Sequence, residues 1–295
     1  MAEQPRIATP SETNAILKRH GFKLKKSLGQ NFLTNPAILS RIVAAGDVGP
    51  DDDVIEIGPG IGALTQYLAE AAHQVLALEI DERLIPVLAE TLAPYPNATV
   101  VEADVLQADL ATLIRDHFDG EHTLKVVANL PYYITTPILM HLIEAHLPIA
   151  SYVVMMQKEV ADRLVAEPNS KDYGSLSIGV QQTMDVAVAF EVKRTSFVPA
   201  PNVDSAIIKL TTREEPRAQV SDQEAFDKLV RGSFKARRKT LWNNLQNLYG
   251  KEPEIKERLT KALDAATIKP SQRAEQLSIS DFARLTEALL VEGFK

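Results

Sequence analysis

Residues 129–133, Asn-Leu-Pro-Tyr-Tyr, bring an amide, a stiff backbone and two aromatic rings together directly after the largely apolar residues 124–128. A buried strand ordinarily ends in turn residues. This segment offers instead hydrogen-bond acceptors at Asn129 and at the backbone carbonyl of Leu130, next to a proline that fixes φ. Such groups could orient a reacting ligand. The alternative is a strand-end turn that buries its aromatic rings.

A second candidate site is the stretch "VIEIGPGIGALT" at residues 54–65. A strand that runs into glycines and then a helix allows backbone N–H groups to approach a ligand closely. Gly58, Gly60 and Ala63 satisfy the relaxed nucleotide-binding pattern G-x-G-x-x-G/A. Glu79, at the end of the next strand, stands where an acid binds ribose hydroxyls in nucleotide enzymes. The alternative is a tight turn without a ligand.

Three residues around this turn favour S-adenosylmethionine over a dinucleotide. They are Pro59 inside the turn, Glu56 on the strand before it and Asp104 at the end of the third strand. The charge of Glu56 is unfavourable for a pyrophosphate but tolerable beside a cationic sulfonium. Asp104 has an alternative role as a helix N-cap before Leu106.

The elements that position these residues alternate between short strands and helices, which predicts an open α/β sheet of parallel strands. The strand-like runs are residues 54–57, 75–80, 99–102, 126–128 and 152–155. Two further strands, at about residues 187–192 and 206–211, leave little room for a helix between them, so we expect them to pair antiparallel at one edge. Helices are expected to start at Thr9-Pro10 and at Asn35-Pro36.

The character of the chain changes after Glu-Glu-Pro at residues 214–216, because residues 221 onward show the pattern of amphipathic helices without strands. We therefore expect a first domain at residues 1–212, which includes a basic N-terminal segment at residues 1–33. A second, helical domain is expected at residues 213–295.

Composition excludes several classes of function. The 295 residues are 45% hydrophobic and include no cysteine, which excludes disulfides, thiolate metal sites and cysteine nucleophiles. The six histidines show no metal-ligand spacing, so we expect no metal. No apolar run reaches the roughly 18 to 20 residues of a membrane span, and residues 1–26 lack the pattern of a signal peptide. A cytoplasmic protein without a membrane partner is expected.

The net charge of −7 argues against a nucleic-acid partner, but the charge is unevenly distributed. Residues 13–46 and 228–251 contain basic and no acidic residues. If residues 228–248 are one helix, three basic residues lie on one stripe beside an apolar stripe and are candidates for phosphate contacts: Arg231, Lys235 and Arg238. Arg237 lies in line with the apolar stripe, where a structural ion pair is the alternative. Either basic stretch can also be a solvated helix face.

Seven segments have the order and spacing of a known family. They are "GQNFL" at 29–33, "EIGPGIG" at 56–62, "EID" at 79–81, "EAD" at 102–104, "NLPYYITTP" at 129–137, "FVPAPNVDSAI" at 197–207 and "FKARRKTLWNNL" at 234–245. Together the segments resemble the KsgA/RsmA-type ribosomal RNA adenine N6-dimethyltransferases over nearly the whole chain. The resemblance implies a class I, Rossmann-like methyltransferase sheet followed by a small all-helical domain.

The resemblance also implies residue roles. The cofactor site for S-adenosylmethionine would comprise Asn31, Leu33, Gly58, Gly60, Glu79, Asp104 and Asn129. In the target site, the Asn129 side-chain oxygen and the Leu130 carbonyl would accept the hydrogens of an adenine amine, while Pro131 fixes the backbone. Tyr132 and Phe197 would stack on the two faces of a flipped base. Core packing is the alternative for Phe197, and Tyr133 is expected to point into the core. The RNA-binding residues would be Lys23, Lys25 and Lys26 together with Arg231, Lys235 and Arg238.

The implied reaction is dimethylation of adenine N6 on small-subunit ribosomal RNA within a 30S assembly particle, by a protein that we expect to be monomeric. Three alternatives differ in substrate or class. The first is an Erm-type enzyme that acts on large-subunit RNA. The second is a non-catalytic ribosome-assembly or transcription factor with the same fold, and the third is a nucleotide-dependent dehydrogenase.

Overall fold

The computed structural model describes residues 6–22 and 31–295, so Lys23, Lys25 and Lys26 lie outside the described residues. The chain divides into two compact units. The first unit comprises Met1–Ala161 and Ala187–Thr212, and the second comprises Asp162–Val186 and Arg213–Lys295. One division, after Thr212, coincides with the change in composition. The divisions that assign residues 162–186 to the second unit have no counterpart in the sequence pattern.

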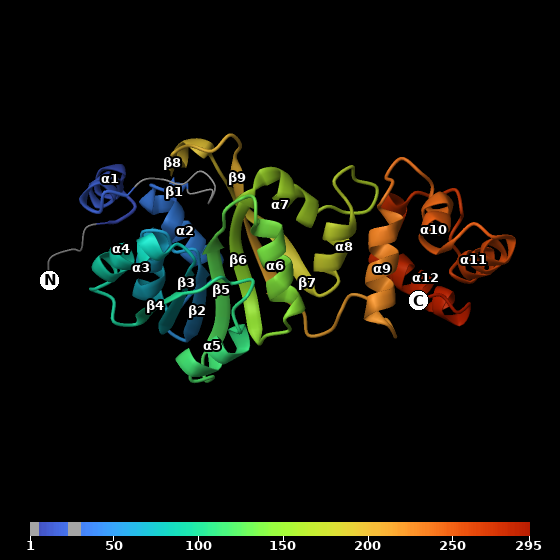
Figure 1. The fold of residues 1–295 in the computed structure, drawn as a ribbon, viewed down its shortest axis with the longest axis horizontal. Coiled ribbons are helices and arrows are strands. Elements are labelled where there is room, and N and C mark those ends of the chain that lie inside the picture. The colour runs from blue at the N-terminus through green and yellow to red at the C-terminus, as the bar shows by residue number, and fades with distance from the viewer. Residues whose placement is uncertain (1–5, 23–30) are drawn as a thin grey trace. The chain divides into compact units, whose positions relative to one another are not determined.

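The main sheet has seven strands in the order β4-β3-β2-β5-β6-β9-β7 (Figure 1). The strands are β2 (Asp52–Ile57), β3 (Gln74–Glu79), β4 (Ala98–Glu102), β5 (Thr123–Asn129), β6 (Ile149–Gln157), β7 (Met184–Val192) and β9 (Ser205–Thr212). β4, β3, β2, β5 and β6 pair parallel, and β9 pairs antiparallel with β6. β2 lies in the middle of the parallel strands and is buried along its whole length, as expected for a strand covered on both faces. The mainly parallel α/β sheet predicted from the sequence is confirmed.

Helices connect the parallel strands. α3 (Ala63–Ala71), α4 (Ile85–Thr91), α5 (Leu110–His117) and α6 (Thr135–Glu144) follow β2, β3, β4 and β5 in turn, and α7 (Lys158–Leu164) follows β6. The two predicted helix starts are confirmed at α1 (Pro10–Arg19) and α2 (Pro36–Ala45). The Thr9 side chain accepts from the backbone N–H of Glu12 at 3.3 Å, and Asn35 accepts from that of Ala37 at 3.1 Å.

A two-stranded sheet joins residues far apart in the sequence. β1 (Phe32–Leu33) pairs antiparallel with β8 (Phe197–Val198), so that Leu33 lies opposite Phe197. Phe32, Leu33 and Phe197 are all buried in the core of the first unit. This pairing brings residues 32–33 to residues 197–198.

The second unit is helical around its own core. Its helices are α8 (Ser175–Gln181), α9 (Gln223–Ser233), α10 (Leu241–Tyr249), α11 (Pro253–Ala265) and α12 (Ile279–Val291). Phe226 and Phe282 are fully buried there, together with Tyr173 from residues 162–186. The Tyr173 hydroxyl donates to the carbonyl of Leu277 at 3.1 Å. Residues 162–186 belong to this unit because their apolar side chains complete its core. No described helix of either unit is long and apolar enough to cross a membrane.

The expected single helix at residues 228–248 is wrong. α9 ends at Ser233, residues 234–239 form turns, and α10 starts at Leu241. Thr240 is the N-cap of α10, and its side chain accepts from the backbone N–H of Asn243. The backbone N–H of Leu241 donates to the carbonyl of Gln272 at 2.7 Å, a long-range bond that replaces a helical one. Arg231 is therefore in the last turn of α9, whereas Lys235 and Arg238 lie in the connection.

Candidate functional site

A pocket lies in the first unit at the carboxyl ends of β2, β3 and β5. Parallel strands place these ends at one edge of the sheet, where ligands of open α/β folds bind. The pocket is lined by all the residues predicted for the cofactor and the target base: Asn31, Leu33, Gly58, Gly60, Glu79, Asp104, Asn129, Leu130, Pro131, Tyr132 and Phe197. Six segments of the sequence thus meet in one cavity.

The turn after β2 presents backbone to this pocket. Gly58 and Gly60 have φ values of 68° and 63°, and Gly62, the N-cap of α3, has 87°. These left-handed values favour glycine. A Cβ at Gly60 would also lie 3.1 Å from the Phe32 ring. Gly62 has no side chain to cap the N–H groups of α3, and a Cβ there would lie 3.0 Å from the Leu92 side chain.

Glu79 is held at the end of β3 by backbone donors. Its two carboxylate oxygens accept from the N–H of Gly60 at 3.1 Å and from that of Asp81 at 2.9 Å. The side chain is buried, and this burial raises its pKa above the ordinary value. Each oxygen retains a second lone pair, so the carboxylate can still accept from vicinal ribose hydroxyls.

Asp104 is fixed by two hydrogen bonds at the end of β4. One oxygen accepts from the backbone N–H of Leu106 at 3.0 Å and the other from the Gln107 side chain at 2.8 Å. Asp104 therefore caps a turn after β4 and also lines the pocket. The alternative role as a helix N-cap is wrong, because no helix starts at Leu106 and α5 begins at Leu110 with Asp109 as its N-cap. An adenine amine would find a carboxylate whose position is already fixed by the turn.

Glu56 provides a buried carboxyl group in the pocket wall. It is 1% exposed, and burial raises the pKa of its carboxyl to about 8, with the nearby charge of Glu79 acting in the same direction. Its Oε2 has no hydrogen-bond partner among the described residues. An unsatisfied carboxylate oxygen fits a cationic ligand better than a pyrophosphate.

Glu56→Gln is expected to make the stability of the protein less dependent on pH. The pKa of Glu56 is about 8 in the folded protein and 4.5 as its ordinary value. The folded state therefore binds the proton more tightly than the unfolded state, which stabilises the fold at low pH. This contribution is lost as the pH rises through 8. The variant should therefore gain stability relative to the wild type between pH 4.5 and 8, by up to about 4 kcal/mol, measured by urea unfolding at pH 5 and pH 8.5. If the free energies of unfolding of variant and wild type differ by the same amount at both pH values, the pKa of Glu56 is not raised in the folded protein.

The residues predicted for the target base start at the end of β5. The Thr135 hydroxyl and the backbone N–H of Ile134 donate to the carbonyl of Pro131 at 2.9 and 3.1 Å, which fixes the turn into α6. The Tyr132 hydroxyl is bonded to the Ser205 hydroxyl at 2.6 Å, and burial raises the pKa of Tyr132. Phe197 is 3% exposed and packs in the core, so its core-packing alternative and its position in the pocket wall are both observed.

Two large side chains in the pocket lining were not predicted to be there. The expectation that Tyr133 points into the core is wrong, because this residue is 59% exposed. Residues 131–134 form a turn, so neighbouring side chains do not alternate between a buried and an exposed face as they would in a strand. Ile80 is 58% exposed and also lines the pocket. In the sequence, its position directly after the strand-end carboxylate Glu79 could have indicated that Ile80 lies at the site.

The candidate RNA-binding residues of the second unit are not among the residues that line this pocket. Arg231, Lys235 and Arg238 are all exposed, as a phosphate-binding role requires. Arg237 donates from Nη2 to the carbonyls of Lys171 at 2.6 Å and Tyr173 at 2.8 Å. Arg237 therefore has a structural role, but through hydrogen bonds to backbone carbonyls and not through the expected ion pair.

The family model for ribosomal RNA adenine dimethylase matches residues 21–289. The chain belongs to this family. It is 63% identical over 283 residues to ribosomal RNA small subunit methyltransferase A of Latilactobacillus sakei, with 96% of this chain and 95% of that protein covered. A protein of the same name from Ligilactobacillus salivarius is 58% identical over 291 residues, which cover 99% of this chain and 98% of the relative.

Solved structures agree with the adenine dimethylase fold. A dimethyladenosine transferase from Plasmodium falciparum has a TM-score of 0.73 at 28% identity, over 88% of this chain and 98% of its own. The 23S rRNA methyltransferase ErmE has a TM-score of 0.65 at 31% identity, over 88% and 99%. These matches confirm the expected Rossmann-like methyltransferase fold of this adenine dimethylase and exclude the dehydrogenase alternative.

Proposed function

We propose that this protein transfers methyl groups from S-adenosylmethionine to N6 of two adjacent adenosines near the 3′ end of 16S ribosomal RNA, giving N6,N6-dimethyladenosine. The observation that carries this proposal is that one pocket is lined by both the nucleotide-binding residues and the segment at residues 129–132. A methyl donor and a planar amine bound there would be neighbours. The small-subunit substrate is supported by the names of the relatives that match over nearly their full length.

The cofactor is proposed to lie along the carboxyl ends of β2 and β3. Glu79 would accept from the ribose hydroxyls and Asp104 from the adenine amine, while Asn31 and Leu33 would lie over the methionine end. When bound, S-adenosylmethionine supplies an electrophilic methyl group on a sulfonium. The buried carboxyl of Glu56, with its unsatisfied oxygen, makes this part of the wall suited to positive charge.

The target amine is a poor nucleophile, because its lone pair is delocalised into the adenine ring. The Asn129 side-chain oxygen and the Leu130 carbonyl would accept its two hydrogens and aim the nitrogen at the methyl group. Tyr132 and Phe197 would bind the two faces of the base, which must leave its stack to enter the pocket. The methylated nitrogen is strongly acidic and loses its proton without a basic side chain.

We further propose that the substrate is RNA within a 30S assembly particle and that the protein acts on it as a cytoplasmic monomer. Methyl transfer by this route needs no metal. Incubation with labelled S-adenosylmethionine and separated, undermethylated subunits tests the assignment. Label in the small-subunit RNA supports it, whereas label in the large-subunit RNA favours the Erm-type alternative. Binding of small subunits without label would favour a non-catalytic assembly factor.

Replacing Arg231, Lys235 and Arg238 together by glutamine is expected to weaken binding to small subunits. If the three contact phosphates, the slope of log affinity against log salt should fall by about 0.7 to 0.9 per lost contact. Cofactor affinity should stay unchanged, because the pocket is formed by the other unit.

The matched control for this variant replaces three other exposed lysines of the same unit, Lys256, Lys261 and Lys269, by glutamine. It removes the same charge from a different surface. Equal losses in both triple variants would mean that only net charge matters. An unchanged affinity and salt slope in the first variant would leave residues 18–26 as the better candidate surface.

A further inference from the structure

We propose that Asp53, His73 and His122 form a binding site for one divalent transition-metal ion of the Zn²⁺ class. The site lies at the amino ends of β2, β3 and β5, whose carboxyl ends form the pocket described above. Four residues of β2 lie between Asp53 and Gly58, and the five steps along the chain span roughly 17 Å. The metal would therefore have a structural role and no part in methyl transfer.

The sheet brings these three residues together. Asp53 is in β2, His73 directly precedes β3 and His122 directly precedes β5, and β2 lies between the other two strands. Backbone bonds fix the two neighbouring strand starts. The N–H of His73 donates to the carbonyl of Asp52 at 2.9 Å, and that of Thr123 donates to Asp51 at 3.1 Å. The backbone that carries the three side chains is therefore already ordered.

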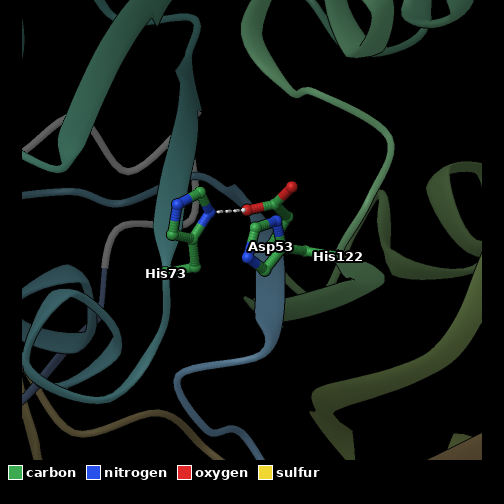
Figure 2. Close-up of side chains that lie close together, drawn as sticks. All are labelled: Asp53, His73 and His122. Atoms are coloured by element: carbon green, nitrogen blue, oxygen red, sulfur yellow. Dashed lines mark hydrogen bonds and ion pairs between the residues drawn. The ribbon is translucent and has the colours of Figure 1, made fainter.

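The side chains offer the ligands that such ions prefer. One atom from each residue, two imidazole nitrogens and a carboxylate oxygen, lie within 4.8 Å of one another. Figure 2 shows the three side chains close together, with His73 Nδ1 bonded to Asp53 Oδ1 at 2.9 Å. The two rings are stacked with their centroids 3.7 Å apart. Because metal bonds measure about 2.0 to 2.2 Å, binding one ion would require the two imidazoles to rotate out of this stacked arrangement.

The buried carboxylate lacks a second partner. The Asp53 side chain is 1% exposed, and its Oδ2 has no hydrogen-bond partner among the described residues. A buried carboxylate oxygen without a donor costs free energy, and a cation at this position would remove that cost. Asp53 is thus an unsatisfied acceptor beside two imidazoles.

A second carboxylate orients one of the imidazoles. His122 Nδ1 is bonded to Asp119 Oδ1 at 3.1 Å, an arrangement typical of metal-binding histidines, which leaves Nε2 to bind the ion. Because imidazole binds a metal only in its neutral form, the affinity should fall as the pH is lowered.

The test uses the full chain without a histidine tag, treated with a chelator and dialysed. Calorimetric titration with Zn²⁺ should show one saturable site, and Zn²⁺ should raise the melting temperature while Mg²⁺ does not. His73→Gln and His122→Gln should each lower Zn²⁺ affinity at least tenfold, whereas the control His141→Gln, a histidine on α6, should bind as the wild type does. The affinity for S-adenosylmethionine should be the same in all four proteins.

Two results would overturn the proposal. The first is wild-type protein that shows no saturable Zn²⁺ binding at micromolar concentrations. The second is wild-type Zn²⁺ affinity in both His73→Gln and His122→Gln. Either result would assign the cluster as a hydrogen-bonded group of side chains that binds no metal. Glutamine substitutions at partly exposed histidines keep the test independent of Asp53, whose burial makes its substitution a risk to folding.

Discussion

Asn129→Ala is expected to lower the single-turnover rate of methyl transfer by about 10² to 10³-fold, because it removes an acceptor aimed at the reacting amine. Asn129 ends β5, opposite Met155 of β6, and lines the pocket beside Leu130. Its loss should reduce cofactor affinity far less than the rate. A rate near that of the wild type would contradict the proposed orientation of the amine, whereas a moderate cofactor defect would not.

Tyr132 provides a matched pair of variants for the same step. Tyr132→Phe keeps the aromatic face and loses the bond to Ser205, whereas Tyr132→Ala loses both. If the ring stacks on the base, the phenylalanine variant should retain most of the rate and the alanine variant should lose about one to two orders of magnitude. Equal losses would mean that the Ser205 bond, and not stacking, is what matters.

Glu79→Ala is expected to weaken cofactor binding by about 1 to 3 kcal/mol, which is roughly 5 to 150-fold. The variant removes the proposed ribose acceptor and also the partner of the Gly60 and Asp81 backbone donors. Asp104→Ala should lose a comparable amount through the adenine amine. Calorimetric titration with S-adenosylmethionine measures both.

The control for Asp104 is Asp109→Ala. Asp109 caps α5 by accepting from the backbone N–H of Thr112 at 3.0 Å, so its loss has a similar local cost outside the pocket lining. Wild-type affinity in Asp109→Ala together with a loss in Asp104→Ala would separate cofactor contact from turn capping. Unchanged affinity in both Glu79→Ala and Asp104→Ala would remove the proposed cofactor site.

The sequence determined the parts of this protein that depend on local pattern. Alternating strands and helices, the caps at Thr9 and Asn35, and the glycines with positive φ after β2 all follow from neighbouring residues. Parallel pairing then requires the carboxyl ends of β2, β3 and β5 to meet, so the position of the pocket was predictable as well. Individual roles within it came from the family resemblance, because composition and spacing do not specify which acceptor faces which ligand.

Only the tertiary structure decided the features that depend on long-range contacts. Residues 228–248 form two helices, and a backbone hydrogen bond from Leu241 to Gln272 stabilises the break between them. Tyr173 packs in the core of the second unit and so joins residues 162–186 to it. Asp53, His73 and His122 are separated by 20 and 49 positions in the sequence, so no local spacing relates them. They meet because strand order and register place the starts of β3, β2 and β5 side by side, and these are set by packing of the whole sheet.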